Sequence, residues 1–294
     1  FERLRAEKPV HFTAAEHTEF HPYWSLSKWD DIKTVDTDHE TFSAEGIINL
    51  SRPITPEQAA AAFNDGTMTQ EEMQKRLEEG TRSLLSMDPP DHEIHRGAVS
   101  EGVSPANLAA MEPLIRERAG AILDGLPIGE EFDWVDKVSV ELTAMTLATL
   151  FDYPQEKRRQ LTYWSNTLTS TPMPGEGPEP QQERMKAARD FYVMMMELIN
   201  SRRSEEPRMD FISLMAHSPH SINFSEAELF GDSVVLLVGG NDTTRNTISA
   251  SVYLLDKNPE ENAKLRANPK LISSMVSETI RWQTPLTHMA RRAR

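Results

Sequence analysis

Cysteine is missing from the 294-residue sequence, and this absence excludes a disulfide framework and fits a cytoplasmic protein. Long apolar runs are missing too: no stretch of about 18 apolar residues occurs, so we expect no integral membrane segment. Basic residues are scarce, because 31 Lys and Arg oppose 46 Asp and Glu, and the formal net charge is −15. This balance argues against nucleic acid or an anionic membrane as a partner.

Common catalytic and metal-binding motifs are also missing. Neither a G-x-S-x-G nor a G-x-x-x-x-G-K-[ST] pattern occurs, which removes the usual support for hydrolase and nucleotide-phosphate functions. The histidine pairs lack a third ligand nearby, so none of them predicts a metal site. These pairs are His17 with His21, His92 with His95, and His217 with His220.

The two ends of the chain are unusual. The sequence opens at Phe1 without an initiator methionine, inside a helix-like segment, and it stops at Arg294 in a basic stretch. We therefore expect an internal fragment of a longer protein, truncated at both ends.

The most informative stretch is Val234-Val-Leu-Leu-Val-Gly-Gly-Asn-Asp-Thr-Thr-Arg-Asn-Thr247. A capping box, Ser225-Glu-Ala-Glu228, precedes it, and no helix breaker follows until Asn258-Pro259. The pattern predicts one helix from Ser225 to about Lys257, on the order of 50 Å long.

Two adjacent glycines interrupt this predicted helix. Each costs about 1 kcal/mol relative to alanine, so Gly239 and Gly240 together weaken the helix by about 2 kcal/mol. Such a concentration of unfavourable residues indicates a functional site. The alternative is a strand over Val234–Val238 that turns at the glycines into a new helix. We favour the single helix, because its capping box begins so close upstream.

The remaining patterns predict a mainly α fold in one domain, residues 1–294, with a small β component near the N-terminus. Short strands are expected at Pro9–Phe12 and Glu19–Leu26, two exposed helices within Pro56–Glu79, and a mobile lid at Ser170–Pro180. Further helices are expected at residues 1–7, Ser27–Val35, Asp91–Ser100, Pro105–Leu123, Trp134–Phe151, Pro154–Leu168, Pro180–Arg203, Asp210–Ala216, Pro259–Ala267 and Pro269–Gln283.

A second stretch, Ser86-Met-Asp-Pro-Pro-Asp-His-Glu-Ile-His-Arg96, combines a proline pair with a helix start. His92 and Arg96 lie four residues apart and so share one helix face. Two donors in this arrangement can hold a carboxylate or phosphate; an ordinary surface pair is the plainer interpretation.

A third stretch is Glu278-Thr-Ile-Arg281, where the charged residues lie three apart on a helix. An exposed ion pair is one interpretation. A buried bidentate pair is at least as well supported, because the surrounding apolar stripe precedes a proline break. This stripe consists of Met275, Val276, Ile280 and Trp282.

Taken together and in this order, the three stretches resemble the cytochrome P-450 monooxygenases, over the whole chain. The resemblance implies a long central helix over a haem, with Asp242 and Thr243 as the acid–alcohol pair that relays protons to bound oxygen. It implies that the helix opens at Gly240 to admit dioxygen and water. It assigns Glu278 and Arg281 a structural role in supporting the haem-ligand loop.

The resemblance also implies haem b (iron-protoporphyrin IX) as cofactor. His92, Arg96 and Arg291 are expected to hold its propionates, and Gly239 and Gly240 to lie against the cofactor. The family's iron is held by a cysteine thiolate beyond the Glu-x-x-Arg helix, and this chain has no such residue, so no metal ligand is expected within it. We therefore expect this fragment to be inactive.

Within the family, several short sequence segments resemble those of the soluble bacterial alkane and fatty-acid terminal hydroxylases. The resemblance implies terminal hydroxylation of an apolar substrate with O2 and with electrons from a ferredoxin and its reductase; Leu236 and Leu286 are expected to contact substrate. The segment from Pro53 to Arg82 does not match that group. The matching segments are Leu123-Asp-Gly-Leu-Pro127, Phe132-Asp-Trp-Val135, Leu147-Ala-Thr-Leu-Phe-Asp152, Leu237–Asn246 and Ile280–Leu286.

Two alternatives stay open. One is that the same fold oxidises terpenes or other cyclic substrates. The other is that the fragment itself is a non-catalytic helical module, in which Asp242 and Thr243 only cap or kink a helix.

Overall fold

The computed structural model describes residues 1–50, 82–170 and 179–294. The described residues form two compact units, one made of Phe1–Arg96 with His288–Arg294 and the other of Gly97–Thr287. The expectation of a single domain stays a prediction. The predicted helices within Pro56–Glu79 and most of the predicted lid at Ser170–Pro180 lie outside the described residues.

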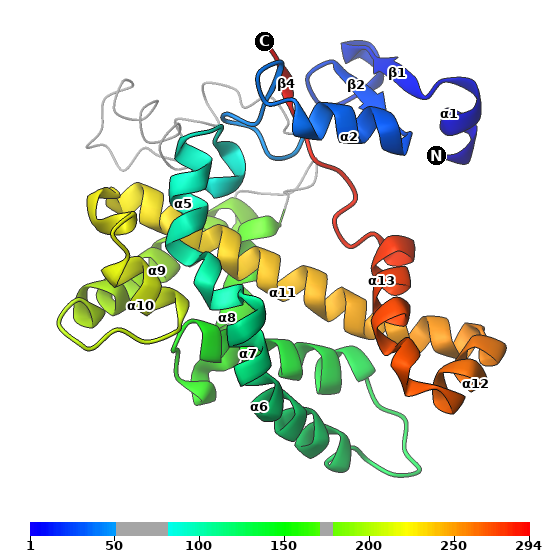
Figure 1. Cartoon of the computed structure of the whole chain (residues 1–294), viewed down its shortest axis with the longest axis vertical. Coiled ribbons are helices and arrows are strands. Elements are labelled where there is room, and N and C mark those ends of the chain that lie inside the picture. The colour runs from blue at the N-terminus through cyan, green and yellow to red at the C-terminus, as the bar shows by residue number, and fades with distance from the viewer. Residues whose placement is uncertain (51–81, 171–178) are drawn as a thin grey trace. The chain divides into compact units, whose positions relative to one another are not determined.

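The first unit contains the predicted β component (Figure 1). Helix α1 (Glu2–Glu7) is followed by strands β1 (Val10–Thr13) and β2 (Tyr23–Leu26), which pair antiparallel, and by helix α2 (Trp29–Thr37). A second antiparallel pair, β3 (Phe42–Ser43) with β4 (Arg292–Ala293), was not expected. Its strands have two residues each, which is too short for an alternating apolar pattern to show in the sequence.

Helices make up the second unit, and their bounds follow the predicted ones closely. Helix α5 (Asp91–Val99) spans the boundary between the two units. Within the second unit the helices are α6 (Pro105–Asp124), α7 (Glu141–Leu150), α8 (Arg158–Thr169), α9 (Glu179–Arg202), α10 (Phe211–His217), α11 (Glu226–Lys257), α12 (Pro259–Ala267) and α13 (Ile272–Gln283). One difference is that the helix predicted from Trp134 begins with a π-helical segment, Val135–Val140, before α7.

Helix α11 is the element around which the second unit is built (Figure 1). Its predicted capping box is present: the Ser225 hydroxyl accepts from the Glu228 backbone N–H, and the Glu228 carboxylate accepts from the Ser225 N–H. The helix is a single α-helix of 32 residues. The alternative of a strand over Val234–Val238 is therefore wrong, because helical packing on α7, α8, α9 and α13 outweighs the cost of the glycines.

The core of the second unit lies between α11 and the helices before it. Trp164 on α8 and Phe230 on α11 both pack against Phe191 of α9, with ring centroids 5.4 and 6.0 Å apart. Leu147 and Leu237 are fully buried between α7 and α11. Burying such side chains contributes about 1.5–3 kcal/mol each, so this apolar core fixes the position of α11.

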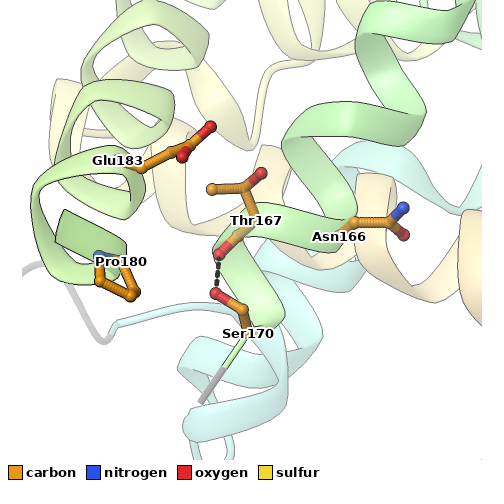
Figure 2. A pocket seen from close by; sticks show the side chains of 5 residues that line it. All are labelled: Asn166, Thr167, Ser170, Pro180 and Glu183. Carbon is orange, nitrogen blue, oxygen red and sulfur yellow. Dashed lines mark hydrogen bonds between the residues drawn. The ribbon is translucent and has the colours of Figure 1, made fainter. Parts of the chain in front are cut away.

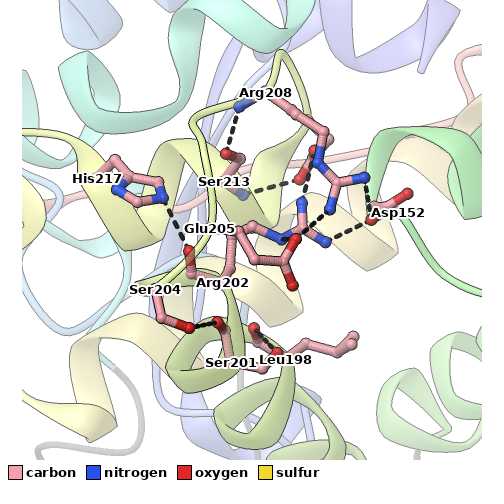
Figure 3. Close-up of polar contacts among 10 residues, drawn as sticks. Asp152, Leu198, Ser201, Arg202, Ser204, Glu205, Arg208, Ser213 and His217 are labelled. Carbon is pink, nitrogen blue, oxygen red and sulfur yellow. Dashed lines mark hydrogen bonds and ion pairs between the residues drawn. The ribbon is translucent and has the colours of Figure 1, made fainter.

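A buried arginine joins α9 to α10 (Figure 3). The Arg202 side chain is 4% exposed and forms ion pairs with Asp210, at 3.0 Å, and with Asp152. Asp210 also caps α10 by accepting the Ser213 N–H at 2.8 Å. A buried cation needs such partners, because an unpaired charge away from water is costly.

None of the described helices is both long enough and apolar enough to cross a membrane.

Candidate active site

A cavity of about 650 Å³ lies beside α11 and α13 in the second unit. Thr243, the predicted catalytic alcohol, lines it, and so does Leu286, a predicted substrate contact. Leu236, the other predicted contact, is not among its lining residues. The remaining lining residues are Thr244, Thr247, Ile248, Ser251, Val276, Ile280, Thr284 and Pro285. Apolar side chains from α13 and the following loop thus face a row of hydroxyl groups on α11.

These hydroxyl groups recur every fourth residue and so share one face of α11. Thr243 donates to the Gly239 carbonyl at 2.6 Å, Thr247 to the Thr243 carbonyl at 2.7 Å, and Ser251 to the Thr247 carbonyl at 2.8 Å. Each hydroxyl proton is thereby used within the helix, while the oxygen keeps acceptor capacity. Toward the cavity, Thr243 is therefore an acceptor of hydrogen bonds.

The two glycines have different surroundings. A Cβ atom built on Gly239 would meet no atom within 4 Å, and Gly239 is exposed. A Cβ atom on Gly240 would lie 2.7 Å from Leu147 Cδ2. The helix opening expected at Gly240 is not seen, because α11 runs unbroken there and Gly240 instead allows the close approach of α7. Of the two glycines, Gly239 is therefore the one with free space beside the helix.

Asp242, the predicted acid, is not among the residues that line the cavity. Its Oδ1 atom accepts from Arg245 Nη2 at 2.6 Å and from Asn241 Nδ2 at 2.8 Å. Arg245 also donates to Asn166 on α8 at 3.1 Å. Although Asp242 and Thr243 are adjacent in sequence, the structure brings one toward α8 and the other to the cavity.

Glu278 and Arg281 form the predicted bidentate pair on α13, with contacts of 2.7 and 2.6 Å. Of the two interpretations left open, the exposed ion pair is the correct one and the buried pair is wrong, because the side chains are 60% and 64% exposed. Their mutual hydrogen bonds lower the pKa of the Glu278 carboxyl and raise the pKa of the Arg281 guanidinium. The apolar stripe beside the pair does not cover it: Ile280 is itself 47% exposed and lines the cavity.

The predicted propionate-binding residues lie in the first unit. His92 is half-buried on α5, and its Nε2 atom is buried without a hydrogen-bond partner. Arg96 is exposed. Arg291 donates to Asp36 at 2.7 Å, so it has an acidic partner that a propionate would have to replace. His92 is thus the residue here that still needs a polar partner.

Asp88 fixes the chain just before α5. Its carboxylate accepts from the Ser43 hydroxyl at 2.5 Å, the Ala44 N–H at 2.8 Å and Arg294 at 2.6 Å. Burial raises the pKa of the Asp88 carboxyl, but these hydrogen bonds and the Arg294 charge outweigh that effect and hold the pKa below its ordinary value. The Asp88-Pro-Pro sequence that begins the predicted motif is therefore an anchor within this unit.

The Cytochrome P450 family model matches residues 34–283. The chain belongs to the cytochrome P450 family. It is 31% identical to linalool 8-monooxygenase of Pseudomonas putida over 100% of this chain and 69% of that protein. Among solved structures it is similar to CYP153D17 from Sphingomonas sp. PAMC 26605, with 38% identity, a TM-score of 0.85 and coverage of 100% of this chain and 68% of that one. It is also similar to a cytochrome P450-153 from Novosphingobium aromaticivorans, with 34% identity, a TM-score of 0.83 and coverage of 99% and 68%.

Family membership confirms the predicted fold and the haem b cofactor. Cytochromes P450 are monooxygenases that use O2, a redox partner and a small-molecule substrate. Each unit by itself offers groups that suit such a cofactor. The second unit has an apolar cavity beside Thr243 and open space at Gly239, and the first has an unpartnered His92 nitrogen that can donate to a carboxylate. The thiolate that holds the iron in this family has no counterpart here, because the chain has no cysteine.

The residues that surround Asp242 are not among those predicted from the sequence. Asn241 and Arg245 lie four apart on α11 and face α8, where Thr162 and Asn166 also lie four apart. The spacing of Asn241 and Arg245 around Asp242 was visible in the sequence, but their partners lie 79 residues away. The hydroxyl row of Thr243, Thr247 and Ser251 could likewise have been predicted from the sequence, because residues four apart share one helix face.

Proposed function

We propose that this chain is the substrate-binding and proton-delivering part of a monooxygenase that hydroxylates an unactivated C–H bond of an apolar molecule. One oxygen atom of O2 enters the substrate and the other leaves as water, with two electrons from a donor and two protons from solvent. The observation that carries the proposal is the cavity in which Thr243 faces the apolar side chains of Val276, Ile280 and Leu286.

The haem, when bound, supplies the activation of oxygen. The protein's own residues perform three tasks. The Thr243 hydroxyl donates its proton to the Gly239 carbonyl, so its oxygen is free to accept a hydrogen bond from a donor in the cavity. Asp242 brings protons from solvent, since its side chain is 27% exposed. The apolar lining, including Leu286, orients the substrate and excludes water.

Other residues are proposed to hold the cofactor or the fold. His92, Arg96 and Arg291 bind the propionates, with Arg291 exchanging Asp36 for a propionate. Gly239 would leave room for the cofactor beside α11. The Glu278–Arg281 pair would have a structural role in supporting the loop that holds the haem ligand.

The substrate we propose is an alkane or a fatty acid, hydroxylated at or near its terminus, with a ferredoxin and its reductase as electron donors. The resemblance of the chain to the cytochromes P450-153 supports this choice. A terpene is the second candidate, and it is favoured by the 31% identity to linalool 8-monooxygenase. Low-spin to high-spin shifts of the haem spectrum, titrated with an alkane series, fatty acids and linalool, separate the candidates.

The role of Thr243 is tested in the full-length haem-loaded protein. Thr243→Ala should divert electrons from product into hydrogen peroxide, whereas Thr243→Ser, which keeps the hydroxyl, should restore product formation. Equal peroxide yields from the alanine variant and the parent would refute the role.

The role of the missing cysteine is tested by the carbon monoxide difference spectrum. We expect no thiolate Soret band from this 294-residue chain, because it has no cysteine. A normal band from the chain alone would contradict the proposal.

A further inference from the structure

Two neighbouring residues of α11 hold the same carboxylate oxygen. Asn241 Nδ2 and Arg245 Nη2 both donate to Asp242 Oδ1, at 2.8 and 2.6 Å. The Asp242–Arg245 pair is largely buried, with side chains 27% and 17% exposed. Charge-assisted hydrogen bonds in such a partly buried place are stronger than exposed ones, so the carboxylate has a fixed orientation.

Both donors are in turn held by α8. The Thr162 hydroxyl lies 3.5 Å from Asn241 Oδ1, and Asn241 is fully buried. One helical turn further, Arg245 Nη1 donates to Asn166 Oδ1 at 3.1 Å. Thr162, Asn166, Asn241 and Arg245 thus form a bridge from α8 to α11, which we call the α8 bridge, and Asp242 is attached to it.

The α8 bridge holds Asp242 away from the place where a proton is needed. Thr243 lines the cavity on the α13 side, whereas Asp242 does not line it and is bonded toward α8. Delivery of a proton from Asp242 to the cavity therefore requires the carboxylate to leave the bridge. The energetic cost of leaving is set by groups on α8 that do not take part in the reaction.

Asn166 also belongs to a second hollow in the unit. It lines a pocket of about 310 Å³ together with Thr167, Ser170, Pro180 and Glu183, from α8, the residue after it and α9 (Figure 2). In that view the Asn166 amide points away from Pro180 and Glu183. Asn166 thus connects the contact region of α8 and α9 with the residue that holds the acid.

We infer that Arg245 is a positioning residue that keeps Asp242 in a resting orientation, and that α8 maintains this orientation through Asn166. The inference rests on the proposed role of Asp242 in proton delivery. Its consequence is that proton delivery is restrained until α8 shifts, so oxygen is not consumed in the absence of substrate.

The test measures oxidation of the electron donor to hydrogen peroxide without substrate, in the full-length haem-loaded protein. Asn166→Ala and Arg245→Ala should each raise this background rate about threefold or more, as expected for residues coupled through one hydrogen-bond network. The matched control is Thr169→Ala, because Thr169 is an exposed α8 residue whose hydroxyl bonds only to carbonyls of its own helix. It should leave the background rate unchanged.

A double-mutant cycle separates positioning from a merely structural role. In an Asp242→Asn background, Asn166→Ala should add no further change to the background rate, because the group that it releases is gone. The same increase in both backgrounds, or no increase in either, would overturn the inference. If Asp242→Asn alone left substrate-dependent turnover unchanged, the proposed role of Asp242 itself would be refuted, which is a different result.

A second measurement does not depend on the loaded enzyme. In the 294-residue chain, amide hydrogen exchange over α8 should rise in Asn166→Ala and Arg245→Ala and stay at the parent level in Thr169→Ala. Unchanged exchange in the first two variants would show that the α8 bridge does not join the helices and would equally overturn the inference.

Discussion

The two glycines of α11 predict opposite responses to the same substitution. Alanine in place of glycine within a helix gains about 1 kcal/mol of helix propensity. At Gly239 the new methyl group meets no atom within 4 Å, so the free energy of unfolding should rise by about that amount.

At Gly240 the same methyl group would lie 2.7 Å from Leu147 Cδ2. Leu147 is 1% exposed, so its side chain has little room to move. Overpacking of this kind costs about 1–3 kcal/mol, so Gly240→Ala should change the free energy of unfolding by between about zero and a loss of 2 kcal/mol. Because the propensity gain is common to both variants, Gly240→Ala should be less stable than Gly239→Ala by about 1–3 kcal/mol.

Urea unfolding of the 294-residue chain, followed by far-ultraviolet circular dichroism, measures this difference. A Leu147→Ala background provides the control. There the added methyl group has space, so Gly240→Ala should become stabilising. The reasoning would be refuted if Gly240→Ala raised the stability of the parent chain as much as Gly239→Ala does.

Three further changes test other parts of the fold. Ser225→Ala removes the cap that holds the Glu228 N–H and should lower the free energy of unfolding by about 1 kcal/mol in urea titrations; an unchanged midpoint would contradict the capping role. Arg202→Met leaves the buried Asp210 carboxylate without its cation and should cost about 3–5 kcal/mol, measured in the same way, whereas a loss below about 1 kcal/mol would show that the pair is replaceable. Asp88 has a lowered pKa in the folded state, so its contribution to stability is fully present above its ordinary pKa of 3.8 and is lost as the pH falls through the lower folded value. Asp88→Asn should therefore flatten the acid side of the stability–pH curve. An unaltered curve would contradict the contribution of the Asp88 carboxylate to stability.

Several features of this protein could be read from the sequence because they depend on residues close together in the chain. The capping box at Ser225 predicted the start of α11, and the helix breaker Asn258-Pro259 predicted its end near Lys257. The bidentate contact between Glu278 and Arg281 followed from their spacing on one helix. Cooperative helix formation and side-chain spacing are local properties, so the sequence determines them directly.

Other features depended on which surfaces meet, and only the tertiary structure decided them. Two of them are contacts between residues distant in sequence: the pairing of Arg291 with Asp36 and the packing of Gly240 on Leu147. A third is the exposure of the Glu278–Arg281 pair, which no distant segment covers among the described residues. The orientation of Asp242 is the clearest case. Its own helix places the Arg245 charge beside it, but Asn166, which lies 79 residues from Arg245 in the chain, holds that charge on the side of α8. Sequence periodicity assigns a residue to a face of its helix, whereas the partner on that face is chosen by the packing of the whole unit.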